Sequence, residues 1–147
     1  MTETHTASSA LNRPGFSARF WSVGGLTLLS AVLLNSLITL AAHALFPVAP
    51  TFAPLQLVNV IPATLVATIG ALGVFALISR RSNHPALLFR RIGLGVLLIS
   101  IIPGLLLPVI KIFPGTTLLE VGALLLLHVA CALLCIYLAP LTIDTRS

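Results

Sequence analysis

The most constraining feature of this sequence is a run of sixty residues, between Arg19 and Arg80, that contains no Asp, Glu, Lys or Arg. Two more charge-free runs follow, at residues 92–110 and 121–143. A helix of about 20 apolar residues is long enough to cross the hydrocarbon core of a bilayer. The first run has room for two such helices and the others for one each. The sequence therefore predicts an integral membrane protein.

The composition agrees with this class. Charged residues make up 7% of the chain and apolar residues 58%, whereas globular proteins have about 25% charged residues. The sequence pI near 10.7 could suggest nucleic-acid binding, but the basic residues lie at the ends of the apolar runs, as membrane topology requires. We therefore predict no nucleic-acid partner.

Four transmembrane helices are predicted, at about residues 20–45, 57–79, 86–110 and 118–141. Pro47 and Pro50 end the first helix, because proline cannot continue a helix beyond its first turn, and Arg80 and Arg81 end the second. The alternating pattern of a membrane β-barrel is absent. We expect an all-α integral membrane bundle of four antiparallel helices, with the proline-containing linker at the membrane interface.

This bundle is assigned to residues 19–142, between a disordered cytoplasmic tail at 1–18 and a short cytoplasmic tail at 143–147. Lys111 would lie on one side of the membrane and all seven arginines on the other: Arg13, Arg19, Arg80, Arg81, Arg90, Arg91 and Arg146. Positive charge marks the cytoplasmic side. We therefore expect a multi-pass protein of the cell (plasma) membrane, with both termini in the cytoplasm.

The sequence leaves two alternatives to this topology, a re-entrant third helix and a cleaved signal peptide. A break at Pro103 would turn the third helix into a re-entrant hairpin and place Arg146 on the opposite side from the other arginines. Ala42-His43-Ala44 has the form of a signal-peptide cleavage site. However, the apolar run before it is about 25 residues long, whereas the apolar core of a signal peptide has about 7–15.

Polar side chains inside a bilayer are costly, so their positions are the best functional clue. On the first helix, Asn35, Thr39 and His43 are four residues apart and share one face. On the fourth helix, Glu120 and His128 share a face. Together with polar positions on the other two helices, these residues form a candidate polar seam that we expect to face inward: Asn35, Thr39, His43, Asn59, Ser100, Glu120 and His128.

Small residues should form matching faces on the second and third helices, because membrane helices pack closely where side chains are small. These faces are Asn59, Ala63, Ala67 and Gly70 on the second helix, and Gly93, Ser100 and Gly104 on the third. From the helical rise of 1.5 Å per residue, His43, Asn59 and Glu120 are expected near the outer interface and His128 nearer the midplane.

Each seam residue also has a purely structural interpretation. Glu120 could be an acid favoured by the helix dipole at the start of the fourth helix, or the partner of Lys111 in a salt bridge. His43 could be an interfacial residue. His128 could make one helix–helix hydrogen bond, or it could serve a proton or ligand. Cys131 and Cys135, four residues apart on one helix, are expected to be packing residues.

No motif for metal binding or catalysis is present. Zinc-site spacings such as His-Glu-x-x-His and paired Cys-x-x-Cys are absent, and His43 and His128 would lie about 15 Å apart along the membrane normal, too far to share a haem. With only Glu3, Glu120 and Asp144 as acids, acid–base catalysis has few groups to use. We predict no metal, no cofactor and no enzymatic activity.

The segment from Arg80 to Arg91 is a candidate contact for anionic lipid headgroups. Arg80, Arg81, Arg90 and Arg91 carry half of the basic charge of the chain. Basic residues at a membrane surface contribute about 1 kcal/mol each to binding of anionic lipid. We therefore expect the lipid bilayer to be a partner at this face.

The arginine-flanked loop with Pro85, the following helix with Ser100 and Pro103, and the stretch Leu124-Leu125-Leu126-Leu127-His128-Val129-Ala130 resemble a family of small bacterial four-helix membrane proteins. That family is a domain of unknown function common in actinobacteria. The resemblance implies a four-helix protein of the bacterial inner membrane. It implies no activity, but it draws attention to His128.

Three functional hypotheses follow. The first is a non-enzymatic accessory protein, a bundle that binds lipid, a membrane-protein partner or a second copy of itself. The alternative is a small transporter or permeation pathway that uses Glu120 and His128. The third is a metal- or redox-dependent membrane enzyme that uses the histidines and cysteines.

Overall fold

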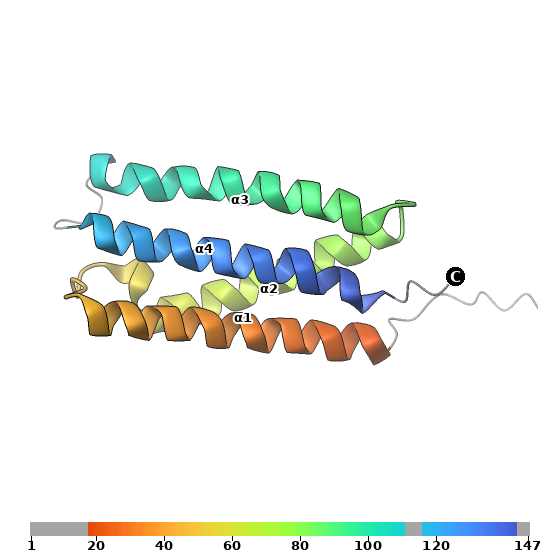
Figure 1. Cartoon of the computed structure of the whole chain (residues 1–147), viewed down its shortest axis with the longest axis horizontal. Coiled ribbons are helices and arrows are strands. Elements are labelled where there is room, and N and C mark those ends of the chain that lie inside the picture. Colours follow the sequence, from red (N-terminus) through yellow and green to blue (C-terminus); the bar gives the residue numbers. More distant parts are fainter. Residues whose placement is uncertain (1–17, 111–115, 144–147) are drawn as a thin grey trace, which may run out of the picture.

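The computed structural model describes residues 18–110 and 116–143, which contain helices and no strands. Four helices are each long and apolar enough to cross a membrane, which confirms the predicted fold class: α1 (Ala18–Leu45), α2 (Leu57–Ser79), α3 (Pro85–Ile110) and α4 (Leu118–Leu138) (Figure 1). Short 3-10 turns, η1 (Ala53–Leu55) and η2 (Ala139–Thr142), precede α2 and follow α4. The predicted tails, Lys111 and Arg146 lie outside the described residues, apart from Ala18, where α1 begins, and Ile143, which follows η2.

The four helices lie side by side along one long axis (Figure 1). α4 packs against both α1 and α3, and α1 packs against α2, whereas α2 and α3 contact each other much less. The Arg19 Nε–H donates to the Leu141 carbonyl over 3.0 Å, so the start of α1 adjoins η2. We call this end, which also holds the α2–α3 turn with Arg80 and Arg81, the arginine end, and the opposite end, which holds η1, the linker end.

The buried face of α1, which packs against both α2 and α4, consists mainly of small and hydroxyl-bearing side chains. α1 buries Gly24, Thr27, Ala31, Asn35, Thr39 and Ala42, which recur every three or four residues. The Asn35 Nδ2 donates to Thr64 Oγ1 of α2 over 2.9 Å. Close approach of backbones and interhelical hydrogen bonds are the main attractions between helices in lipid, so this face holds α1 and α2 together.

The α3–α4 interface depends on two glycines of α3. A Cβ on Gly93 would lie 2.8 Å from Ile136 Cγ1, and a Cβ on Gly104 would lie 3.0 Å from Leu125 Cδ2. Both distances are shorter than ordinary van der Waals contact. Only Phe89 and Gly104 of α3 are buried. α3 therefore packs on α4 through a narrow face, and most of its other side chains are exposed or partly exposed.

Two apolar clusters close the ends of the bundle. At the linker end, Phe52 and Leu55 are fully buried and pack with Val60 and Leu127. The linker thus extends two side chains into the end of the bundle, and its position at the membrane interface stays a prediction. At the arginine end, the rings of Phe75 and Phe89 meet edge to face, 5.0 Å between centroids. Between these clusters α2 and α3 diverge.

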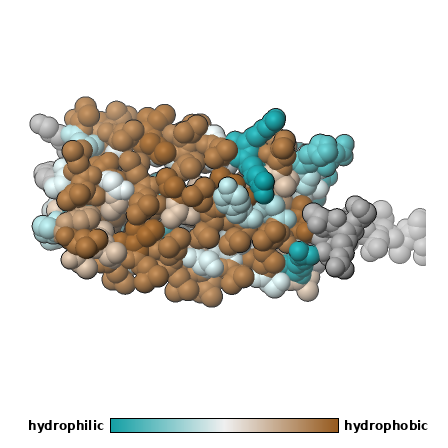
Figure 2. All heavy atoms as spheres, viewed as in Figure 1, coloured by the Kyte–Doolittle hydropathy of each residue, from teal (hydrophilic) through white to brown (hydrophobic). Residues whose placement is uncertain are grey.

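Prolines have different effects in α3 and α4. Pro103 and Pro108 lie inside a continuous α3, so the re-entrant hairpin is wrong. α4 ends at Leu138, three residues before the predicted end, and the chain continues as a 3-10 turn that contains Pro140, because proline lacks the N–H of a regular helix bond. Figure 2 shows apolar surface along most of the bundle, with hydrophilic atoms gathered toward the arginine end.

Candidate binding groove

Two adjoining cavities form a groove: the larger lies between α2, α3 and α4, and the smaller lies between α2 and α4, with Asn35 of α1 and Pro54 of η1 at its border. The larger, about 400 Å³, lies between Gly70 and Val74 of α2, Gly93 and Val96 of α3, and the central turns of α4. The smaller, about 240 Å³, continues toward the linker end. Both are lined by Ala67, His128 and Cys131. The larger cavity falls within the 300–1,000 Å³ of typical ligand sites.

The α2 wall of the groove consists of the small residues Ala63, Ala67 and Gly70, which are exposed. The expectation that this face packs against a neighbouring helix is therefore wrong. α2 instead buries a different face, with Val60, Thr64 and Thr68. Because the small residues leave space that no helix fills, the groove opens on the side surface of the bundle.

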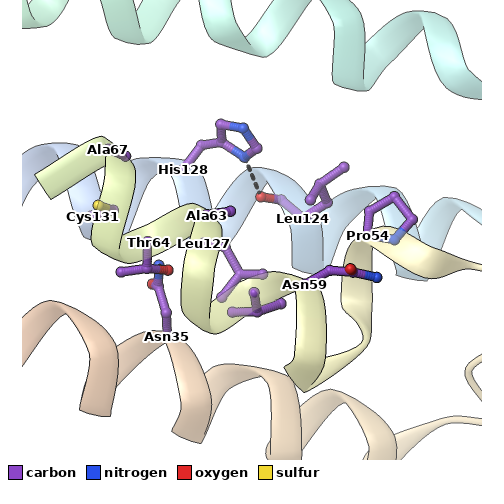
Figure 3. A pocket seen from close by; sticks show the side chains of 11 residues that line it. Asn35, Pro54, Asn59, Ala63, Thr64, Ala67, Leu124, Leu127, His128 and Cys131 are labelled. Carbon is purple, nitrogen blue, oxygen red and sulfur yellow. Dashed lines mark hydrogen bonds between the residues drawn. The ribbon is translucent and has the colours of Figure 1, made fainter. Parts of the chain in front are cut away.

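His128 is half-buried and projects from α4 into the groove (Figure 3). Its Nδ1–H donates to the Leu124 carbonyl one turn earlier, over 2.7 Å. In a neutral imidazole one nitrogen carries the proton and the other accepts, so this bond leaves Nε2 as an acceptor. No described residue hydrogen-bonds to Nε2. The helix–helix hydrogen bond considered for His128 is therefore not the bond seen here.

Asn35 of α1 holds a buried acceptor without a partner beside the smaller cavity (Figure 3). The residue is 4% exposed and lines the smaller cavity. Its amide nitrogen is bonded to Thr64, but its Oδ1 is buried and has no hydrogen-bond partner within the described parts of the chain. A buried carbonyl oxygen without a partner costs about 1–3 kcal/mol, so Asn35 Oδ1 is an energetic cost within the α1–α2 contact.

Two thiol groups line the same region. Cys131 Sγ lies 3.7 Å from Thr68 Oγ1 and faces the groove, and Cys135, one turn further, is buried. Both are free cysteines. In the described residues no three His, Cys, Asp or Glu side chains come together as a metal site would require.

Glu120 lies outside the groove and is enclosed at the linker end. Its side chain is fully buried, and its Oε1 accepts the Ala49 N–H over 2.7 Å. Its Oε2 accepts the N–H and the hydroxyl of Thr117 over 2.7 and 3.1 Å. The Glu120 N–H donates to Thr117 Oγ1, which completes a capping box at the start of α4. The structure therefore does not bring Glu120 and His128 into one site.

His43 and Asn59 also lie outside the buried interface. Both are exposed, so their expected inward placement is wrong. The His43 Nε2 donates to the Leu55 carbonyl over 3.1 Å, and the Asn59 Nδ2 donates to the Ala53 carbonyl over 2.8 Å. These bonds tie η1 to α1 and α2. Asn59 also borders the smaller cavity.

The remaining seam residues are bonded within their own helices. Thr39 is buried, and its hydroxyl donates to the Asn35 carbonyl over 2.9 Å. Ser100 lines the larger cavity, but its hydroxyl donates to the Leu97 carbonyl over 2.8 Å. Neither residue offers a free proton to a ligand.

Sequence reasoning missed Thr64, Thr68 and Thr117. The two threonines of α2 are four residues apart, a spacing that marks one helix face, and they lie beside the small-residue face rather than on it. Thr117 and Glu120 have the Ser/Thr-x-x-Glu spacing of a capping box. That spacing was visible in the sequence and pointed to a structural role for Glu120.

The four candidate lipid-contact arginines, Arg80, Arg81, Arg90 and Arg91, are exposed at the arginine end. The Arg90 guanidinium lies 5.6 Å from the centroid of the Tyr137 ring, within the range of a cation–π contact. None of the four lines the groove.

Comparison with known proteins gives a family and no activity. No curated protein and no solved structure matches the chain. The sequence model of a family of unknown function, DUF6069, matches residues 16–143, well over half of the chain. Because this match covers most of the chain, the protein belongs to the DUF6069 family of unknown function.

Proposed function

We propose that this protein is a non-enzymatic membrane protein that binds a lipid-like molecule in the groove between α2, α3 and α4. The observation that carries the proposal is the position of the groove: it lies between the two apolar clusters and opens on the side of the bundle. Hydrophobic walls with a few placed polar groups are typical of small-molecule sites. A molecule dissolved in the bilayer could enter without crossing water.

The absence of catalytic activity is part of this proposal. The whole chain has three acidic residues, and the oxygens of Glu120 are occupied by hydrogen bonds from Ala49 and Thr117. A general acid or base must have its proton within reach of a substrate, and Glu120 has no place in the groove. The same placement gives no support to a transporter in which Glu120 and His128 act together.

We further propose that the arginine end faces the cytoplasm of a bacterial cell and contacts anionic headgroups. Arg80, Arg81, Arg90 and Arg91 lie at this end, and cytoplasmic loops carry the excess of basic residues. Orientation can be tested with a membrane-impermeant maleimide on Asn83→Cys and Thr51→Cys variants, made in a background without Cys131 and Cys135. In intact cells Thr51→Cys should react and Asn83→Cys should not. The reverse pattern would contradict the proposed orientation.

The groove is tested by filling it. Gly70 lines the larger cavity, and a Cβ there meets no atom within 4 Å, so Gly70→Leu should fold and block the site. Gly73→Leu is the matched control, because Gly73 is also exposed and unobstructed but lies outside the groove. Native mass spectrometry of protein released gently from its own membrane should show a bound apolar molecule on the wild type and on Gly73→Leu.

The same spectrum of Gly70→Leu should lack that adduct. A bare 15.4 kDa protein in the wild-type sample would count against groove binding. Equal retention of the adduct by both leucine variants would place the bound molecule elsewhere on the surface.

A further inference from the structure

Resting on the groove proposed above, we infer the chemical class of its ligand: an uncharged apolar molecule that carries a hydroxyl group, which donates a hydrogen bond to His128 Nε2. The ring is positioned at the junction of the two cavities, since His128 lines both. The polar end of the molecule therefore belongs at the middle of the groove, and its apolar body extends along the cavity walls.

The hydrogen bond at Nδ1 dictates the need for a donor. Because the Nδ1 proton is given to the Leu124 carbonyl over 2.7 Å, the neutral ring can only accept at Nε2. A ketone, an ester or an ether has no proton to offer this nitrogen. An alcohol or a phenol does. Fixing one histidine nitrogen on a backbone carbonyl so that the other faces a ligand is a recurrent arrangement in functional sites.

The rest of the groove favours the same class. Asn35 borders the smaller cavity, and its buried Oδ1 has no partner within the described ranges, so this end of the groove adds no hydrogen-bond donor from Asn35 Oδ1. The Ser100 hydroxyl is already committed to the Leu97 carbonyl. Lysine and arginine do not occur among the lining residues of either cavity, so a phosphate or carboxylate would meet acceptors and no cation. An anionic headgroup suits the arginine end instead.

The test compares two probes that differ only in the donor: farnesol and its methyl ether. Dissociation constants are measured by native mass spectrometry titration of the wild type and two variants. Farnesol should bind the wild type about tenfold more tightly than the ether, the order expected for one hydrogen bond that would otherwise leave a buried acceptor unpaired. His128→Phe keeps an aromatic ring without the acceptor, so it should bind both probes equally.

Ser100→Ala is the matched control, because Ser100 lines the same cavity but its proton is held within α3. This variant should keep the tenfold preference. A direct readout comes from protein labelled with ¹⁵N-histidine. The Nε2 resonance of His128 should shift when farnesol is added and should not shift with the ether, and the His43 resonances, at the linker end, should stay unchanged with both probes.

The outcomes separate this inference from the function on which it rests. Equal binding of both probes to the wild type, or a preference that survives His128→Phe, would overturn the hydroxyl inference and leave the groove in place. Failure of both probes, together with a bare wild-type protein in its native membrane extract, would overturn both. If His128→Phe does not fold, the probe ratio and the Nε2 shift of the wild type decide alone.

Discussion

Glu120 and His128 are both polar residues of α4, two turns apart, yet their surroundings are opposite. Both oxygens of Glu120 accept hydrogen bonds from the linker and from Thr117, and its side chain is fully buried. The Nδ1 of His128 is bonded to a carbonyl of its own helix, and its Nε2 has no partner among the described residues. A buried polar group is costly unless it is bonded. The polar groups of Glu120 are therefore all bonded within the protein, whereas the half-buried His128 keeps one nitrogen available in the groove.

This contrast separates two uses of polar residues in a membrane protein. Satisfied groups hold the fold together, and replacing them should lower stability. Unsatisfied groups that line a cavity should matter for what binds there and hardly for the fold. Substitutions of bonded polar groups should therefore lower the free energy of unfolding more than substitutions of groups that line the groove.

The largest effect is expected for Glu120→Ala. The substitution removes the acceptor of the Ala49 and Thr117 N–H groups, and hydrogen bonds to charged groups contribute about 1.5–3 kcal/mol each. We expect the free energy of unfolding to fall by about 3 kcal/mol in mixed-micelle denaturation. Thr117→Ala removes the hydroxyl that caps the Glu120 N–H and donates to Glu120 Oε2, but keeps the Thr117 N–H, and should cost about 1 kcal/mol. A Glu120→Ala protein as stable as the wild type would show that the linker end does not depend on this carboxylate.

The next effect is expected for Gly93→Ala. Its Cβ would lie 2.8 Å from Ile136 Cγ1, and overpacking of this kind costs about 1–3 kcal/mol. Gly95→Ala is the control on the same helix, because a Cβ there meets nothing within 4 Å. Gly93→Ala should cost less when it is made in an Ile136→Ala background, where the crowded side chain is absent. Equal stability of the two alanine variants would mean that α3 does not rest on α4 at Gly93.

A smaller effect is expected for the Asn35–Thr64 hydrogen bond between α1 and α2. Interhelical hydrogen bonds in membrane proteins contribute about 0.6 kcal/mol on average. A double-mutant cycle with Asn35→Leu and Thr64→Val should give a coupling free energy of about that size. A coupling free energy of zero would show that this hydrogen bond does not hold α1 to α2.

The smallest effect is expected for His128→Phe. Its one hydrogen bond is to the Leu124 carbonyl of its own helix. Loss of this side-chain bond leaves the backbone hydrogen bonds of α4 intact. The free energy of unfolding without ligand should change by no more than about 0.5 kcal/mol, because no hydrogen bond to another helix is lost. A loss as large as that of Glu120→Ala, measured in the same denaturation experiment, would erase the distinction between the two regions.

Much of the fold could be predicted from the sequence because helix formation in a membrane is a local requirement. Backbone polar groups in lipid must be bonded within the segment, so a charge-free apolar run and the arginines at its ends are enough to indicate a helix. The four helices follow from this rule alone. The burial of Phe52 and Leu55 does not, since an apolar linker suits the interface and the bundle interior equally well.

The groove could not be predicted because it depends on contacts between distant segments. Ala63, Ala67 and Gly70 have the pattern of a helix-packing face, and the pattern is the same whether a helix or a cavity lies against it. The difference arises from Gly93 and Gly104, which draw α3 onto α4 and away from α2. His128 was recognised as the unusual residue, but the use of its two nitrogens required the geometry.

Because the groove opens on the side of the bundle, the affinity that matters for a ligand is its affinity from the bilayer and not from water. A ligand that arrives through the side of α2 has first partitioned from water into the bilayer, and each buried CH₂ favours that transfer by about 0.8 kcal/mol. Occupancy is then governed by the mole fraction of ligand among the lipids rather than by its concentration in water. A single hydrogen bond at His128 would be enough to select one membrane component among many of similar hydrophobicity.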